Sequence, residues 1–163
     1  MYGFYKYVLN KERDKWGVIL MKSIGIVRRL DELGRIVLPK ELRNTMNIKG
    51  GVPLEIHVEK DLIIITKYDE ILRKSGIVRN ADELGRVVLP KELRKMLKLQ
   101  TNIPLEFFID EQRIILKKFY SDKTCMITGV IDDKNFIFEN GKFVLSKDGA
   151  NILIQELQKY VAQ

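Results

Sequence analysis

The sequence contains one segment twice, and this repeat limits the folds that the chain can adopt. GIVRRLDELGRIVLPKELRN, which begins at Gly25, recurs as GIVRNADELGRVVLPKELRK from Gly76. The offset of 51 residues holds without a gap from 25–67 to 76–118, and 22 of the 43 aligned positions are identical. A unit of about 50 residues rarely buries enough apolar surface to be stable alone. Since the single cysteine cannot provide a disulfide or a cysteine-based metal site, we expect the two copies to pack against each other.

Each copy predicts short strands and one short helix, so the expected fold class is mainly β with short helices (β+α). The strands of the first copy are expected at residues 25–30, 35–38, 53–58 and 62–67. Residues 31–34 predict a hairpin turn, because Gly34 can adopt a positive φ. Pro39 is expected to start the helix, in which Leu42 and Met46 form an apolar pair one turn apart.

The second copy indicates which side of the last strand is buried. Arg113 and Lys117 stand where the first copy has Leu62 and Thr66. Because successive side chains of a strand point to opposite faces, the residues expected in the core are Ile63, Ile65, Ile114 and Leu116. Residues 68–74 between the copies reach at most about 25 Å. That length permits the copies to pair within one chain, and pairing between two chains is the alternative.

The charge of the chain favours a polyanionic partner. Lysine and arginine number 29 against 22 acidic residues, which gives a net charge of +7. Such a balance favours nucleic acid ahead of an anionic membrane. No apolar run approaches the roughly 20 residues that a membrane-spanning helix needs. All ten arginines precede residue 114, so the last 43 residues form a module of a different kind.

Basic side chains recur at equivalent positions of both copies. Those of the first copy are Arg28 and Arg29 on the first strand, Arg35 after the turn, and Lys40 and Arg43 on one helix face with Asn44 and Asn47. Those of the second are Arg79, Arg86, Lys91, Arg94 and Lys95, with Lys98 on the same face. Arginine suits phosphate because its planar fork donates two parallel hydrogen bonds. The alternative is that they are solvated surface charges, some of them paired with Asp31, Glu32 or Glu41.

Other residue types give no sign of catalysis. Adjacent carboxylates in the turns, Asp31-Glu32 and Asp82-Glu83, point to different sides and do not form a shared acid–base site. His57 has no nucleophile or metal-ligand companion in its motif and is interpreted as structural. Cys125 is interpreted as a small buried hydrophobe. The strand aromatics are expected in the core or an interface, with single-strand stacking the alternative; they are Tyr68, Phe107, Phe108, Phe119 and Tyr120. We therefore expect no enzyme activity, no metal and no cofactor.

The tail repeats the pattern faintly. Residues 141–148 parallel 34–41, and 127–130 would be the first strand of this third hairpin, with an Asn/Gly-containing turn. Ser146 suits the N-cap of a final helix, which carries an apolar stripe of Leu153, Leu157 and Val161. The positions that match Arg28 and Arg43 fall near Asp132 and at Ala150, so the tail is interpreted as a self-association module. Residues 1–20 match neither repeat; they could be an added tail, an upstream start or a short packing helix, and no secretory signal is expected.

The repeated string GIVR–DELGR–VLPKELR, followed by PLE and a strand of the form II-L/I-x-K, resembles the AbrB family of bacterial transition-state regulators. The resemblance covers residues 22–68 and 73–119, and the tail TCMITGV…NGKFVLSKDGANILIQELQ resembles the C-terminal domain of the same family. It implies a swapped-hairpin AbrB barrel, here built as a pseudo-dimer of two tandem units. The expected segments are an extension at 1–20, units at 21–69 and 73–120, and a small C-terminal hairpin-and-helix domain at 121–163.

The resemblance also implies which residues contact DNA. The DNA-contacting arginines of the family fall on Arg28, Arg35, Arg43, Arg79, Arg86 and Arg94. Adjacent basic positions of the family fall on Arg29 and Asn44 in the first copy, and on Asn80 and Lys95 in the second. The first copy thus lacks a helix charge and the second a strand charge. A further departure is that AbrB-like chains normally carry one such unit rather than two.

The expected function is that of a sequence-tolerant, A/T-leaning transcriptional regulator of double-stranded promoter DNA, and a repressor of stationary-phase or sporulation-type genes. The expected partners are that DNA and a second copy of the chain, bound through the C-terminal domain, with no membrane involved. The expected location is the cytoplasm, in association with the nucleoid. The alternative is the antitoxin of a toxin–antitoxin pair that binds its own promoter. Antitoxins usually carry an extended acidic tail, whereas residues 121–163 have a net charge of only −1, which favours the regulator.

Overall fold

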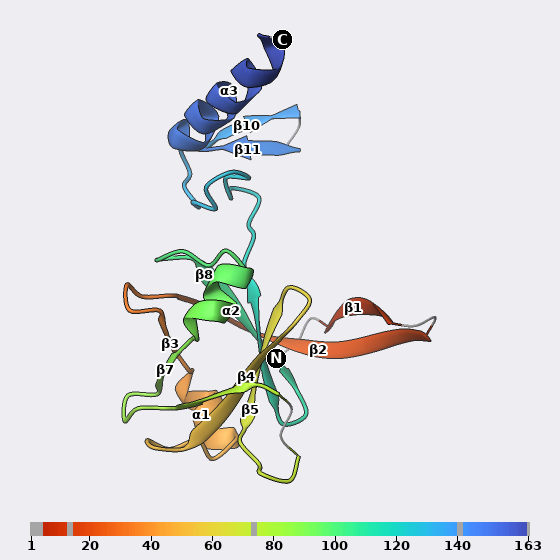
Figure 1. Cartoon of the computed structure of the whole chain (residues 1–163), viewed down its shortest axis with the longest axis vertical. Helices are drawn as coiled ribbons and strands as arrows, with labels where there is room; N and C mark the ends of the chain where they lie inside the picture. The colour runs from red at the N-terminus through yellow and green to blue at the C-terminus, as the bar shows by residue number, and fades with distance from the viewer. Residues whose placement is uncertain (1–4, 13–14, 73–74, 140–141, 163) are drawn as a thin grey trace. The chain divides into compact units, whose positions relative to one another are not determined.

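Residues 5–12, 15–72, 75–139 and 142–162 are described by the computed structural model. The chain divides into two units, Met1–Lys118 and Phe119–Gln163 (Figure 1). Three expected features lie wholly or partly outside the described residues: positions 1–4 and 13–14 of the extension, positions 73–74 of the segment between the copies, and the Asn140–Gly141 turn of the tail.

The first unit is built from nine strands and two short helices among the described residues. The strands are β1 (Tyr5–Glu12), β2 (Lys15–Arg29), β3 (Arg35–Val37), β4 (Pro53–Glu59), β5 (Leu62–Lys67), β6 (Ile77–Asn80), β7 (Arg86–Val88), β8 (Pro104–Asp110) and β9 (Arg113–Lys118). The helices are α1 (Lys40–Thr45) and α2 (Lys91–Met96). Seven strands form one antiparallel sheet in the order β1-β2-β8-β9-β5-β4-β6, and β3 pairs with β7 separately. The expected mainly β fold with short helices is confirmed.

The two copies exchange strands within one chain. β2 of the first copy pairs with β8 of the second, while β6 of the second pairs with β4 of the first. β5 also pairs with β9, and β3 with β7. Each copy keeps one hairpin of its own, β4–β5 and β8–β9. The expectation that the copies pack against each other is confirmed, and their pairing is intramolecular.

The turn at 31–34 is present, but the hairpin expected around it is not. The backbone N–H of Asp31 donates to the Arg35 carbonyl at 3.0 Å, and that of Gly34 donates to the Asp31 carbonyl at 3.0 Å. Among the described strands, β2 and β3 share no ladder, because each pairs with a strand of the other copy. The turn thus reverses the chain locally and sends β3 across to β7.

Helix α1 begins one residue later than expected. Pro39 occupies the capping position before Lys40, and Pro90 does the same for α2. Leu42 and Met46 are 3% and 5% exposed, so the expected apolar pair is confirmed. The helix ends at Thr45, and Asn47 beyond it has a positive φ of 51°. The expected helix face that included Asn47 and Lys98 is therefore wrong at those two positions, since Lys98 also follows its helix, with φ 52°.

The core draws on both copies. The expected core residues Ile63, Ile65, Ile114 and Leu116 are at most 1% exposed and belong to one cluster. That cluster also contains the β3–β7 pair Ile36 and Val87. Full burial of each such side chain stabilises the fold by about 1.5–3 kcal/mol. A second cluster consists of Met21, Leu62, Ile64, Phe108 and Ile115. Of these, only Phe108 was expected in the core or an interface, as a strand aromatic.

Residues ahead of the first repeat are strands rather than a helix. β1 pairs with β2 over eight residue pairs, from Tyr5 opposite Lys22 to Glu12 opposite Lys15. The packing-helix alternative for residues 1–20 is therefore wrong over the described part of this segment. β2 runs from the extension into the first repeat and crosses the expected start of that unit at residue 21.

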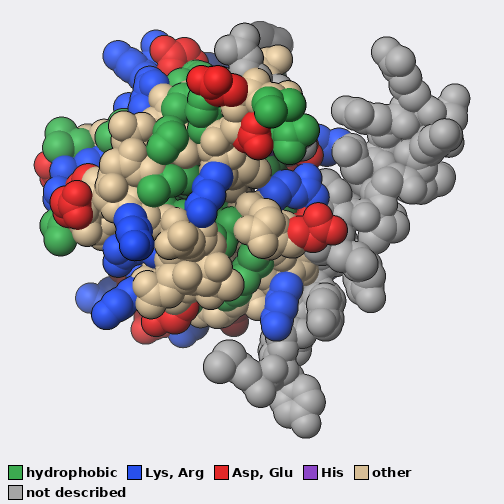
Figure 2. Space-filling model, turned by 90° about the horizontal axis from the view of Figure 1, so that it is seen from below, with side chains coloured by type: hydrophobic (Ala, Val, Ile, Leu, Met, Phe, Trp, Pro, Cys, Tyr) green, Lys and Arg blue, Asp and Glu red, His purple; other side chains and the backbone are tan. Residues whose placement is uncertain are grey.

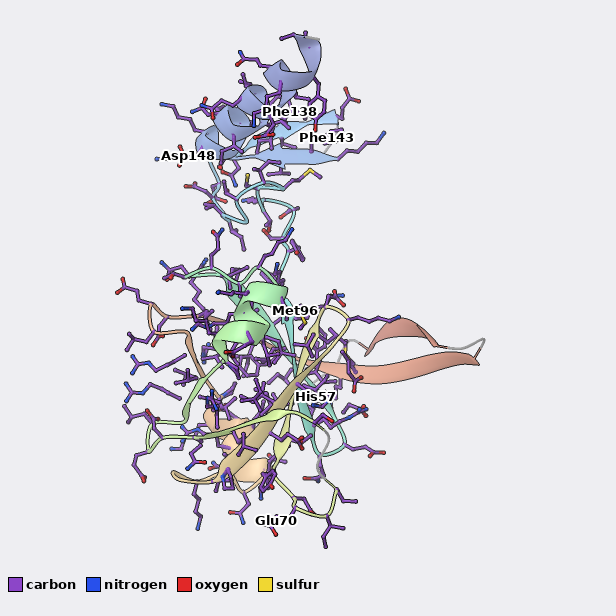
Figure 3. The ribbon with its side chains drawn as sticks, in the orientation of Figure 1. His57, Glu70, Met96, Phe138, Phe143 and Asp148 are labelled. Atoms are coloured by element: carbon purple, nitrogen blue, oxygen red, sulfur yellow. The ribbon has the colours of Figure 1, made fainter. Side chains whose placement is uncertain are left out.

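The second unit contains a small hairpin and a helix. β10 (Phe136–Phe138) pairs with β11 (Phe143–Leu145), and α3 spans Lys147–Val161. Phe138 and Phe143 are register partners on the two strands (Figure 3). Ser146 caps α3 as expected, its hydroxyl accepting from the Gly149 N–H at 3.0 Å. Of the expected stripe, Leu153 is half-buried, while Leu157 and Val161 are 51% and 84% exposed.

The strand expected at 127–130 is wrong. Residues 126–128 form a turn instead, and Gly129 follows with a φ of 75°. The backbone N–H of Gly129 donates to the Cys125 carbonyl at 2.9 Å, and that of Cys125 donates to the Val130 carbonyl at 2.8 Å. These local bonds use the groups that a ladder would need. No helix among the described residues is long and apolar enough to cross a membrane.

Candidate nucleic-acid interface

Both repeat turns hold an arginine with an aspartate. The Oδ1 atom of Asp31 accepts from the N–H groups of Leu33 at 3.0 Å and Arg35 at 2.8 Å. Its Oδ2 atom accepts from Arg35 Nε at 2.6 Å. Asp82 repeats the arrangement in the second copy, with its Oδ2 atom 2.5 Å from Arg86 Nε. The aspartates of the turns thus orient the arginines. The alternative interpretation, in which some basic residues pair with acidic neighbours, is confirmed for Arg35 with Asp31, whereas no ion pair of Glu32 or Glu41 occurs among the described residues.

Both aspartates are held ionised by these bonds. Burial raises the pKa of Asp31, but hydrogen bonds from Arg35 and Leu33 together with the Arg35 charge outweigh it and hold the pKa below its usual 3.8. For Asp82, the Arg86 N–H bond is the largest cause of a lowered pKa, ahead of the opposing effect of burial. In both turns, Nε of the arginine donates its hydrogen bond to Oδ2 of the aspartate. No Nη hydrogen bond of Arg35 or Arg86 occurs among the described residues, and these nitrogens are available to donate to a ligand.

Each helix arginine lies against the turn of the other copy. A Cβ on Gly34 would lie 2.4 Å from Cζ of Arg94, and one on Gly85 would lie 2.4 Å from Nε of Arg43. A backbone hydrogen bond links the same turn to the segment just before α2, because the Leu89 N–H donates to the Gly34 carbonyl at 2.9 Å. Gly34 and Gly85 also have φ values of 72° and 77°. Each of these glycines therefore provides both the turn conformation and the space for the arginine.

The first unit thus has two basic ends, each assembled from both copies. We call residues 28–35 together with α2 the Arg35 end, and residues 79–86 together with α1 the Arg86 end. The turn of each end lies beside the helix of the other copy (Figure 1). The ten basic residues predicted from the sequence divide between them. Those of the Arg35 end are Arg28, Arg29, Arg35, Lys91, Arg94 and Lys95, and those of the Arg86 end are Arg79, Arg86, Lys40 and Arg43.

Most of these side chains are exposed. Arg28, Arg29, Arg79, Lys40, Lys91 and Lys95 are exposed, and the other four are half-buried. Arg29 Nη1 donates to the Asn102 carbonyl at 2.8 Å, which holds it beside the loop after α2. Acidic side chains are interspersed with basic ones on the face that Figure 2 displays.

One pair of residues was missed from the sequence. Leu33 and Leu84, at equivalent positions of the two turns, are 65% and 63% exposed. The sequence did contain a sign of them, because leucine is repeated at this position of both turns. A turn of this kind has no core contact that would require an apolar side chain. Leucine there places an apolar group two residues before Arg35 and Arg86.

The remaining candidates have structural surroundings. His57, on β4 (Figure 3), has its Nε2 atom 3.1 Å from Glu59 Oε1, and its Nδ1 atom has no partner among the described residues. Cys125 is buried, as predicted. Burial raises its pKa, but hydrogen bonds from Ser146 and Thr128 outweigh that effect and lower the pKa to about 6. Of the aromatics, Phe107 and Phe108 are buried, whereas Tyr120 is 65% exposed.

Comparisons with known proteins match the chain along most of its length. The family described as "Antidote-toxin recognition MazE, bacterial antitoxin" matches residues 27–73 and 78–123, and the AbrB C-terminal domain matches residues 124–160. The transition state regulatory protein AbrB of Bacillus subtilis is 47% identical over 87 residues, which are 53% of this chain and 91% of that protein. The chain belongs to the AbrB family of transition-state regulators.

Two further relatives agree with this assignment. The putative transition state regulator Abh of B. subtilis is 44% identical over 87 residues, 53% of this chain and 95% of Abh. Stage V sporulation protein T of the same organism is 45% identical over 75 residues, 42% of each chain. AbrB and Abh are shorter than this member of the AbrB family, because the 87 aligned residues are nearly their whole length. The solution structure of PHS018 from Pyrococcus horikoshii aligns with 59% of this chain and 94% of its own chain, at 23% identity. The TM-score of 0.36 is too low to indicate a shared fold.

Proposed function

We propose that this chain is a transcriptional regulator that binds double-stranded promoter DNA through the two basic ends of its first unit, and that it acts as a repressor. The observation that carries the proposal is the cross-copy placement of arginines, with Arg94 against the turn that bears Arg35 and Arg43 against the turn that bears Arg86. Each end thereby combines turn and helix guanidinium groups, which donate well to phosphate oxygens. Because the chain belongs to a family of regulators, DNA binding explains the basic residues of the two ends better than an enzyme activity does.

The contacts proposed here are mainly to phosphates. Phosphate contacts fix the position of a protein on the duplex, whereas base contacts or duplex shape provide sequence preference. The helices α1 and α2 have six residues each and present few side chains for reading base edges. We therefore propose that preference comes from groove width and duplex deformability, which favours A/T-rich sites.

The C-terminal unit is proposed to join two chains. Its match to the AbrB C-terminal domain and the exposure of Leu157 and Val161 on α3 support a self-association role. A homodimer would bring two DNA-binding units together, which raises the affinity for long DNA through effective concentration. A regulator of promoter DNA acts where the chromosome is, so we also propose a cytoplasmic, nucleoid-associated location.

An antitoxin function is the second candidate, because residues 27–73 and 78–123 match a family described as an antitoxin. The tail argues against it as the main function, since residues 124–160 match the AbrB C-terminal domain instead. Expression of the neighbouring genes, one at a time, in cells that lack this gene distinguishes the antitoxin from the regulator. Growth arrest that depends on one neighbour would favour the antitoxin, whereas altered transcription without arrest supports the regulator.

Binding to A/T-rich promoter fragments across a salt series tests the proposed function directly. If four to six side chains neutralise phosphates, the logarithm of the association constant falls with the logarithm of salt concentration at a slope of about −4 to −5. A G/C-rich duplex of equal length is the control for site preference. Failure to bind either duplex at low salt, or an affinity that does not change with salt, would contradict the proposal.

A further inference from the structure

The two copies differ in charge at two positions of the proposed interface. Arg29 on β2 is replaced by Asn80 on β6, and Asn44 on α1 is replaced by Lys95 on α2. The number of positive charges at these two positions is the same in both copies, because the first copy has Arg29 and the second has Lys95. All four residues are exposed.

The strand exchange brings both differences to the same end. Arg29 lies opposite Pro104 and donates to the Asn102 carbonyl, in the segment that follows α2 with Lys95. Asn80 lies opposite Pro53, in the segment that follows α1 with Asn44. The Asn102 N–H donates to the Leu30 carbonyl at 2.7 Å, and the Gly51 N–H donates to the Ala81 carbonyl at 2.8 Å. Each strand is therefore bonded to the helix-bearing segment of the other copy.

The two ends consequently carry unequal charge. The Arg35 end has six basic and three acidic residues, and the Arg86 end has four basic and three acidic residues. The acidic residues are equivalent, since Asp31, Glu32 and Glu92 correspond to Asp82, Glu83 and Glu41. In a symmetric homodimer of identical units, the two ends would be equal by the two-fold operation. Fusion of two non-identical copies in one chain removes that constraint.

We infer that the first unit binds an asymmetric DNA duplex in one polarity, with the Arg35 end on the half-site that has the narrower minor groove. This rests on the proposed function and goes beyond it, because it assigns unequal tasks to the two ends. A narrow minor groove, as in A-tracts, has an enhanced negative potential that attracts cationic side chains. The end with two additional cations gains more from that half-site, so rotation of the protein by half a turn on the duplex lowers the affinity.

A charge-transposed variant tests this inference without a change in net charge. It combines Arg29→Asn with Asn80→Arg, and Lys95→Asn with Asn44→Lys. Each new residue already occurs at the equivalent position of the other copy, so the backbone tolerates it. Circular dichroism and thermal unfolding check that the variant keeps its fold.

Photo-crosslinking reports the polarity. The photoreactive amino acid benzoylphenylalanine is placed at Leu33 or at Leu84, the exposed and equivalent turn positions of the two ends. The probe duplex has an A-tract in one half and G/C-rich sequence in the other, and is short enough for one binding unit to cover it. With the original charges, we expect the probe at Leu33 to react mainly with the A-tract half and the probe at Leu84 mainly with the other half. In the transposed variant, the preference reverses.

Equal reaction of each probe with both halves, or an unchanged preference in the transposed variant, would overturn the inference. A protein that forms no salt-sensitive complex with any duplex would instead refute the proposed function. A salt-sensitive complex without polarity refutes the inference alone, so the two failures are distinguishable.

Discussion

Arg94 of the second copy lies against Gly34 of the first, so close that a Cβ on this glycine would come within 2.4 Å of the guanidinium carbon. The contact joins the turn that holds Arg35 to the helix that holds Lys91 and Lys95. It is repeated between Arg43 and Gly85. The proposed interface therefore depends on two glycines that have no side chain to offer DNA.

Gly34→Ala should weaken DNA binding by displacing Arg94. Alanine at a positive φ also costs about 1–2 kcal/mol of stability. Gly25→Ala is the matched control, because Gly25 has a similar φ of 68° but a Cβ added there would meet no atom within 4 Å. We expect both variants to lose a similar amount of stability in urea unfolding, while gel shifts show a loss of affinity for Gly34→Ala alone. Equal DNA binding by both variants would exclude a role for the Arg94 contact.

Replacement of Arg35 and Arg86 together by alanine should reduce DNA affinity by more than about tenfold, since each end loses its turn guanidinium. The fold should persist, because both ion pairs with aspartate are partly exposed and such pairs contribute little to stability. Arg113→Ala serves as a control for the loss of an arginine that is paired with an aspartate, here Asp110 on β8. Fluorescence anisotropy with a labelled duplex measures the affinities, and wild-type affinity in the double variant would refute the assignment.

Acid should destabilise the first unit through Asp31 and Asp82. Both carboxyl groups have a lower pKa in the folded chain than the usual 3.8. Their stabilising contribution is therefore fully present above pH 3.8 and is lost as pH falls through the lower, folded-state value. Urea unfolding between pH 3 and pH 6 should show a smaller acid dependence for the Asp31→Asn, Asp82→Asn variant than for the wild type. An identical pH dependence of wild type and variant would show that the hydrogen bonds and ion pairs of Asp31 and Asp82 do not stabilise the folded chain.

The stability of the second unit should rise between pH 6 and pH 9. Hydrogen bonds from Ser146 and Thr128 lower the pKa of Cys125 to about 6 against the burial that raises it, whereas an unfolded cysteine titrates near 9.0. Across that interval the folded chain releases a proton that the unfolded chain retains, so folding becomes more favourable with rising pH. Thermal unfolding of Cys125→Ser, which has no thiol to titrate, should lack this increase. A parallel pH dependence in wild type and variant would contradict the assignment.

Leu157→Asp with Val161→Asp should abolish self-association. Both residues lie on α3 and are exposed in the single chain, and a carboxylate there would oppose apolar contact with a second copy. Light scattering should give twice the 19.0 kDa chain mass for the wild type and the chain mass for the variant. Gln155→Asp with Gln158→Asp, at two exposed positions of the same helix, adds the same two negative charges and is the control. A wild-type protein that is monomeric at high concentration would refute the proposed role of the tail.

The sequence predicted the local elements of the repeats well and their partners only in part. The loss of apolar character at Arg113 and Lys117 indicated one buried face of the last strand, so Ile63, Ile65, Ile114 and Leu116 could be identified. The same signal could not show that the other face is also buried at Ile64 and Ile115. The partner of β3 could not be identified in the same way. A strand of three residues has the same pattern whether it pairs with β2 or with β7, and only the fold as a whole decides between them.

The prediction of a first strand in the tail was wrong for a different reason, although the Ser146 cap and the final helix were predicted correctly. Ile127 to Val130 has β-branched residues that favour a strand, but Gly129 adopts a positive φ and the local carbonyl groups are used within the turn. The aromatic strand Phe136–Phe138, which pairs with β11 instead, has a pattern of the same strength. The distribution of charge between the ends also required the structure, because the sequence alone assigns Arg29 and Lys95 to different copies.

Pairing of the copies inside one chain has a consequence for how the protein responds to dilution. Where two separate subunits must meet to complete a barrel, its folded fraction falls as the protein becomes scarce. Here β2 and β8, like β4 and β6, are paired strands of one chain, so the folded fraction of the first unit does not depend on protein concentration. Scarcity can separate one chain from another while each retains an intact surface for its ligand. Dilution therefore acts on the proposed DNA binding only through the occupancy of sites and the joining of chains, and it leaves the binding unit itself assembled.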